Sequence, residues 1–124
     1  MIHRILIVED EQLLAEAMKE FLSSAGYDVD CASEREEAEA LLAHYPYALV
    51  ITDLALTALG LAGVDILDSL AGQAKRPKII VYSGHPDPDL ESHLASHGVD
   101  AFLQKPQPLG ELVRVASELL ECRA

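Results

Sequence analysis

Residues 3–10 read HRILIVED, a short apolar run that ends in two acids. A run of this length fits a strand buried on both faces of a sheet, because such strands are continuously apolar rather than alternating. Four more strand candidates follow, at residues 28–32, 48–52, 78–82 and 101–103. The chain therefore begins a pattern of short strands at regular intervals.

Helical periods separate these strand candidates. Residues 12–25 carry an apolar stripe that we expect to face the core, and Gly26 suits the left-handed position after a helix. Ser33 and Glu36 match a capping box that would open a second helix. Further helices are expected at residues 64–70, 87–98 and 108–120. Strict alternation of strands and helices predicts a parallel sheet with helices on both faces. The first stripe comprises Leu13, Leu14, Ala17, Met18, Phe21 and Leu22.

Length and charge exclude several classes of protein. The 124 residues have the length of one domain. The formal net charge of −12 disfavours binding to DNA or to an anionic membrane by this domain, since both require a positive face. The sequence contains no apolar run of membrane-spanning length and no signal-peptide pattern, and its two cysteines have no metal-binding spacing. We expect a cytoplasmic protein.

Functional side chains gather at the predicted strand ends, where parallel sheets carry their chemistry. The first strand ends in Glu9 and Asp10, the third in Asp53, the fourth in Ser83 and the fifth in Lys105. Crowded carboxylates raise one another's pKa unless a cation offsets them. Mg²⁺ suits such a cluster, because it takes one or two carboxylates and completes its shell with water and phosphate. The same geometry leaves one carboxylate free to attack phosphorus.

These residues, in this order, resemble the receiver domain of two-component response regulators. The likeness runs through ILIVEDE, VITDLAL, IIVYSGH and DAFLQKP. Asp53 and Ser83 are 30 residues apart and Ser83 and Lys105 are 22 apart, both typical of that family. The resemblance implies a three-layer α/β/α flavodoxin-like fold with a five-stranded parallel sheet in the order 2-1-3-4-5. It also implies that residues 1–124 form one receiver domain in a His-Asp phosphorelay.

The resemblance implies a role for each residue of the site. Asp53 would accept a phosphoryl group from a sensor histidine kinase or a histidine phosphotransfer protein. Glu9, Asp10, Asp53 and the backbone carbonyl of Ala55 would hold Mg²⁺. Lys105 would pair with these acids and then with the phosphoryl group, and Lys105–Pro106 is a candidate for a cis peptide bond.

Further residues would convert phosphorylation into a signal. Ser83 and Phe102 are the switch pair that the resemblance implies, while Ala55 and His85 flank the path of the water that removes the phosphoryl group. Partner binding, or symmetric homodimer formation, is expected through the fourth helix, the fifth strand and the fifth helix. Such a domain is a signalling switch rather than an enzyme, although it catalyses its own phosphorylation and dephosphorylation.

One loop departs from the family's pattern and leaves an alternative open. Thr57 stands where the family commonly has proline, and the matching glycine, Gly63, makes the leucine-rich loop at residues 54–63 two residues longer. A pseudo-receiver that binds proteins without phosphorylation is therefore the alternative function. A flavin carrier is disfavoured because acids follow the first strand and would repel the cofactor's phosphate. An aspartate phosphatase is disfavoured because the two residues after Asp53 include no second acid.

Overall fold

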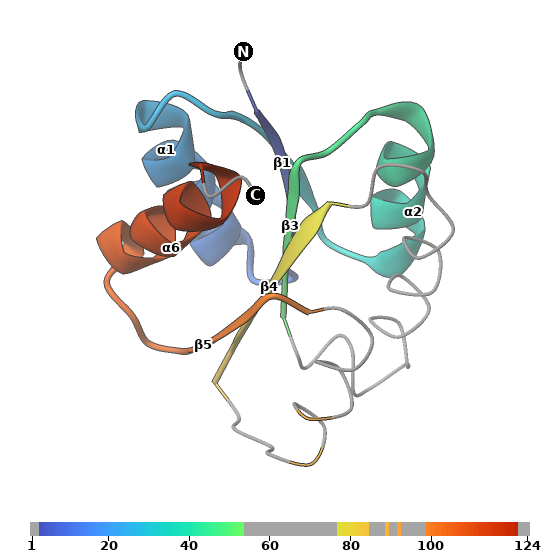
Figure 1. Ribbon diagram of the computed structural model, residues 1–124. Helices are drawn as coiled ribbons and strands as arrows, with labels where there is room; N and C mark the ends of the chain where they lie inside the picture. The colour runs from blue at the N-terminus through green and yellow to red at the C-terminus, as the bar shows by residue number, and fades with distance from the viewer. Residues whose placement is uncertain (1–2, 54–76, 85–88, 90–91, 93–98, 122–124) are drawn as a thin grey trace.

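Five strands and three helices make up the part of the chain that the computed structural model describes, namely residues 3–53, 77–84, 89, 92 and 99–121 (Figure 1). In chain order they are β1 (Arg4–Val8), α1 (Gln12–Ser24), β2 (Asp28–Ala32), α2 (Arg35–His44), β3 (Leu49–Thr52), β4 (Lys78–Ser83), β5 (Ala101–Gln104) and α6 (Leu109–Glu121). The helices expected at residues 64–70 and 87–98 and the loop at residues 54–63 lie outside the described residues.

The strands form one parallel sheet in the order β2-β1-β3-β4-β5, which confirms the expected topology. β1 and β3 are neighbours although a helix, a strand and a second helix separate them in the sequence. Val8 is paired with Thr52 at the ends of these two strands. The next residues along the chain, Glu9 and Asp53, therefore leave the sheet side by side.

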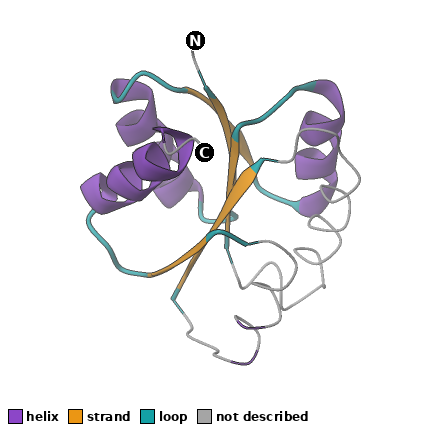
Figure 2. Ribbon diagram, in the orientation of Figure 1, coloured by secondary structure: helices purple, strands orange, loops and turns teal. Residues whose placement is uncertain are grey.

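Helices cover both faces of the sheet (Figure 2). α1 and α6 pack on one face, where Met18, Leu22 and Leu112 are buried against the strands. α2 packs on the other face through Ala38 and Leu42. The central strands are thus enclosed on both sides, which explains why β1 and β3 are continuously apolar.

The apolar stripe expected on α1 is wrong at two positions. Leu13 is 77% exposed and Phe21 is 47% exposed. The buried residues are Ala15, Met18 and Leu22, which form one narrow face of the helix. Leu13 and Phe21 lie outside this face and are exposed to solvent. Gly26 follows the helix with φ of 98°, in the left-handed region expected for it.

The expected capping box of α2 is also wrong in detail. The helix begins at Arg35, and the carboxylate of Glu37, not that of Glu36, accepts the backbone N–H of Ser33 at 2.8 Å. With Ser33 as the N-cap the helix would begin at Glu34, but Glu34 is itself the N-cap. Because the helix begins one residue later than expected, the acid that accepts the N–H of Ser33 is Glu37 instead of Glu36.

A group of polar side chains, here called the Arg4 cluster, joins the start of β1 to β2 and to the connection between α2 and β3. It comprises Arg4, Asp30 and Tyr47. Arg4 Nε and Nη2 each lie 2.9 Å from Asp30 Oδ2, and the Tyr47 hydroxyl donates to the same oxygen at 2.6 Å. The Arg4 guanidinium also stacks on the ring of Tyr45, 3.9 Å from its centroid. These contacts fasten the edge strand β2 and the α2–β3 connection to β1.

Candidate functional site

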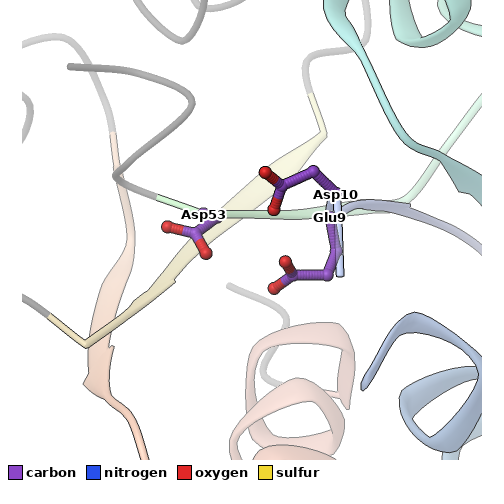
Figure 3. A group of neighbouring side chains, drawn as sticks. All are labelled: Glu9, Asp10 and Asp53. Carbon is purple, nitrogen blue, oxygen red and sulfur yellow. The ribbon is translucent and has the colours of Figure 1, made fainter. Parts of the chain in front are cut away.

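Three carboxylates meet beyond the ends of β1 and β3. Glu9, Asp10 and Asp53, here called the acid cluster, each offer an oxygen within 4.8 Å of the others (Figure 3). Glu9 and Asp53 are only 3% and 7% exposed, whereas Asp10 is exposed to solvent. The neighbouring positions of β1 and β3 thus bring together the three acids that the sequence placed at strand ends.

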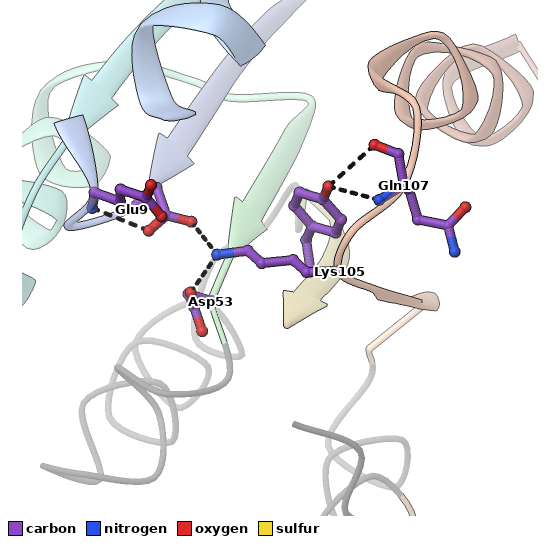
Figure 4. A network of polar contacts seen from close by, with 6 residues as sticks. Glu9, Asp53, Lys105 and Gln107 are labelled. Carbon is purple, nitrogen blue, oxygen red and sulfur yellow. Dashed lines mark hydrogen bonds and ion pairs between the residues drawn. The ribbon is translucent and has the colours of Figure 1, made fainter. Parts of the chain in front are cut away.

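Lys105, which follows the edge strand β5, reaches across the carboxyl end of the sheet and bridges two of these acids. Its Nζ lies 2.6 Å from Glu9 Oε1 and 2.6 Å from Asp53 Oδ2 (Figure 4). The second oxygen of Glu9 accepts the backbone N–H of Glu11 at 3.1 Å. The Glu9 carboxylate is therefore held at both oxygens, and its orientation toward Asp53 is fixed by the fold.

The electrostatics of the site favour additional positive charge. Burial raises the pKa of Glu9 and outweighs the hydrogen bonds from Lys105 and Glu11, which lower it. Burial lowers the pKa of Lys105, but the hydrogen bonds to Asp53 and Glu9 outweigh it, and the pKa is raised. Both groups thus hold their protons more tightly than usual, Glu9 because it is buried and Lys105 because two carboxylates surround its ammonium.

This donor set fits a hard divalent cation. Mg²⁺ prefers carboxylate oxygens and keeps several waters, and the exposed Asp10 leaves one side of the acid cluster open to solvent. A pocket of about 400 Å³ between α1 and β2 reaches Glu9 and Asp10 from that side. The acid cluster therefore has the charge, the ligand chemistry and the access that Mg²⁺ requires.

The remaining predicted residues are described to different extents. Phe102 on β5 is half-buried and packs against the core under α2. The Lys105–Pro106 peptide bond is cis. Ser83 is the last residue of β4, but its side chain lies outside what the structure describes. Ala55 and His85 lie outside the described residues altogether.

Tyr82 belongs to the site and was not singled out from the sequence. It is 3% exposed and lies on β4, and its hydroxyl contacts both backbone groups of Gln107, two residues after Lys105. The pattern KIIVY identifies Tyr82 only as a core residue of a strand. A buried phenol hydroxyl needs a hydrogen-bond partner, which was the one available signal, but the sequence does not indicate where that partner lies.

Comparison with known proteins agrees with this geometry. The response regulator receiver domain family matches residues 5–117. The transcriptional regulatory protein PmrA of Pectobacterium parmentieri is 39% identical over 113 residues, which cover 88% of this chain and 48% of that protein. A cyclic di-GMP phosphodiesterase of Thermotoga maritima is 32% identical over 90% of this chain and 29% of its own length. The chain thus spans half or less of each of these relatives.

Solved structures share the fold over almost the whole chain. A CheY-like response regulator receiver domain protein from Methanospirillum hungatei superposes with a TM-score of 0.88 and 25% identity, covering 98% of this chain and 95% of that one. A signal receiver domain from Bermanella marisrubri gives a TM-score of 0.84 and 29% identity, with 97% and 99% covered. With the sheet order and the acid cluster, these matches establish that the chain belongs to the response regulator receiver domain family.

Proposed function

We propose that residues 1–124 form one receiver domain that accepts a phosphoryl group on Asp53. The donor would be the phosphohistidine of a sensor histidine kinase or of a histidine phosphotransfer protein. The observation that carries this proposal is the position of Asp53. Its carboxylate is buried at the end of β3, beside two further acids and in contact with the ammonium of Lys105.

The chemistry is a displacement at phosphorus. One carboxylate oxygen of Asp53 forms the new P–O bond, the P–N bond to the donor histidine breaks, and its electron pair returns to the imidazole nitrogen. Glu9, Asp10, Asp53 and the Ala55 carbonyl would hold Mg²⁺, which supplies charge neutralisation at the phosphoryl oxygens. Lys105 already lies between Glu9 and Asp53, so its ammonium needs only a side-chain movement to reach a phosphoryl group on Asp53.

The switch and the output surface follow from the same proposal. Ser83 would contact the phosphoryl group, and Phe102 would move with it, so that β5 and α6, together with the fourth helix of the family, change their surface. That surface would bind a partner or a second copy of the chain. His85 and Ala55 would flank the water that later hydrolyses the aspartyl-phosphate. These steps make the domain a signalling switch that catalyses its own phosphorylation and dephosphorylation.

The exposed apolar residues of α1 support a protein as the phosphodonor. Leu13 and Phe21 lie on the helix that starts three residues after Glu9, and both expose large apolar side chains. Leu13 lies in the first turn of α1, close to the acids in the sequence, where an incoming protein donor could cover its apolar side chain. The transcriptional role in the names of several relatives supports action in the cytoplasm, where bacterial DNA is found.

Intact-mass spectrometry with a small-molecule phosphodonor tests the proposal. Wild-type protein should gain one phosphoryl group when Mg²⁺ is present and none after chelation. Asp53→Asn should abolish the gain, because the neutral amide is a far weaker nucleophile than the carboxylate that it replaces. Asp28→Asn, which changes an exposed acid at the start of β2, is the matched control and should behave as wild type.

Two outcomes would contradict the proposal. Undiminished phosphorylation of the Asp53→Asn protein would place the acceptor elsewhere. No phosphorylation of the wild-type protein at saturating Mg²⁺ would favour the alternative, a pseudo-receiver that binds proteins independently of phosphorylation.

A further inference from the structure

The segment that carries Lys105 has little of its own to hold it in place. Among the described strands, β5 pairs only with β4, at one edge of the sheet. Its residues are half-buried or exposed, and the chain then runs through the exposed Pro106 and Pro108 before α6 begins. Burial of apolar side chains therefore restrains Lys105 much less than it restrains Glu9 and Asp53.

Tyr82 supplies the missing restraint from β4. The backbone N–H of Gln107 donates to the Tyr82 hydroxyl at 3.3 Å, and that hydroxyl donates to the Gln107 carbonyl at 3.4 Å (Figure 4). Pro106 has no N–H, so Gln107 offers the first backbone donor after Lys105. Gln107 is thus the first residue after Lys105 whose backbone offers the Tyr82 hydroxyl both a donor and an acceptor.

The same side chain also contacts the ammonium. Lys105 Nζ lies 5.4 Å from the centroid of the Tyr82 ring, within the range of a cation–π interaction. The ring is buried among the apolar residues under α1 and α6, so it is fixed in position. Tyr82 therefore contacts both neighbours of Pro106: its hydroxyl bonds the backbone of Gln107, and its ring faces the ammonium of Lys105.

From these contacts we infer that Tyr82 is a positioning residue for Lys105. It couples the strand that ends at Ser83 to the ammonium that lies between Glu9 and Asp53. This inference rests on the proposed function, since the position of Lys105 affects activity only if Asp53 takes up a phosphoryl group. When the phosphoryl group arrives, a fixed backbone limits the reorganisation to the lysine side chain.

A purely structural role for Tyr82 makes a different prediction from a positioning role. If the residue only fills the core, Tyr82→Phe should act like the loss of any buried phenol hydroxyl. Tyr47→Phe provides that control, because Tyr47 is similarly buried and its hydroxyl bonds Asp30, away from the acid cluster.

The experiment compares phosphorylation rates in two backgrounds. With a small-molecule phosphodonor and Mg²⁺, Tyr82→Phe should slow the gain of mass between about threefold and about tenfold, the equivalent of a lost hydrogen-bonded contact. Tyr47→Phe should leave the rate unchanged. In a Lys105→Met background, Tyr82→Phe should have no further effect, because the group that it positions is gone.

A second measurement does not depend on phosphorylation. The Lys105 ammonium should give a slowly exchanging ¹H–¹⁵N signal, assigned by its loss in Lys105→Met. Tyr82→Phe should accelerate its exchange with water, whereas Tyr47→Phe should not.

The outcomes separate this inference from the proposed function. An unchanged rate and an unchanged ammonium signal in Tyr82→Phe would overturn the positioning role. An equal slowing in the Lys105→Met background would also overturn it, since the effect would then not pass through Lys105. A wild-type protein that takes up no phosphoryl group would contradict the proposed function alone, while the ammonium signal would still decide whether Tyr82 positions Lys105.

Discussion

Two charged clusters near opposite ends of one sheet are composed differently. In the Arg4 cluster, one guanidinium balances one carboxylate, and a neutral phenol donates to the same carboxylate oxygen. In the acid cluster, three carboxylates lie together, and among the described residues the ammonium of Lys105 pairs with two of them, Glu9 and Asp53. Counted over the described residues, the charges of the first cluster balance, whereas the second cluster has more negative than positive charge.

The pKa shifts follow this difference. Burial raises the pKa of Asp30, but the hydrogen bonds from Tyr47 and Arg4 outweigh it, and the pKa lies below its ordinary value. At Glu9 burial outweighs the hydrogen bonds, and the pKa lies above its ordinary value. The ionised form of Asp30 therefore stabilises the fold, while ionised Glu9 is held at a cost. We infer that a balanced cluster joins strands, and that an unbalanced one is kept for a cation and for chemistry.

The largest effect on stability should come from adding Mg²⁺, which would bind the acid cluster. Mg²⁺ at one hundred times its Kd should raise the free energy of unfolding by about 2.7 kcal/mol, because the ion binds only the folded arrangement. Differential scanning calorimetry should show this gain in wild type and in Asp30→Asn. Asp10→Asn should lose most of it. An equal gain in Asp10→Asn would mean that the ion binds outside the acid cluster.

A smaller effect should distinguish the clusters in the absence of metal. Asp30→Asn should lower the free energy of unfolding by about 1–2 kcal/mol, because Arg4 and Tyr47 lose their charged acceptor and partial exposure limits the loss. Glu9→Gln should lower the free energy of unfolding less or not at all. The substitution removes a buried ionised acid, and Lys105 keeps its ion pair with Asp53. Urea unfolding curves measure both. Equal losses would mean that the two clusters stabilise the fold in the same way.

The smallest effect should appear in the pH dependence. The folded pKa of Asp30 lies below its unfolded value of about 3.9, so its stabilisation is present above that pH and is lost as pH falls through the folded pKa. The difference in Tm between wild type and Asp30→Asn should stay constant from about pH 8 to about pH 5 and shrink below about pH 4. A difference that persists unchanged into acid would show that the charge of Asp30 is not what stabilises the Arg4 cluster.

Much of the fold was predictable because it depends on local patterns. The run ILIV, the acids that follow it and the second run that ends before Asp53 are sufficient to place three carboxylates at one edge of a parallel sheet. The order of the strands came from the family resemblance, since alternation alone does not determine which strands are neighbours. The position of Lys105 beside Glu9 depends on that order.

The details that escaped prediction depend on tertiary contacts. A helical stripe wide enough to include Leu13 and Phe21 is compatible with the sequence of α1, and only packing against the sheet selects the narrower face. The contact between Tyr82 and Gln107 joins residues 25 positions apart, and the bond from Tyr47 to Asp30 joins residues 17 positions apart. Neither has a sequence signature, because each requires the register of the strands.

The ion pair between Lys105 and Glu9 spans 96 residues of chain, and this has a consequence for synthesis on the ribosome. Chains emerge with the N-terminal end first, so β1 and β3 are available for pairing well before Lys105 has been made. Closing these two strands early would bring Glu9, Asp10 and Asp53 together without the ammonium of Lys105. We expect like-charge repulsion to delay that closure, so that the five-stranded sheet forms only after β5 and Lys105 have left the ribosome.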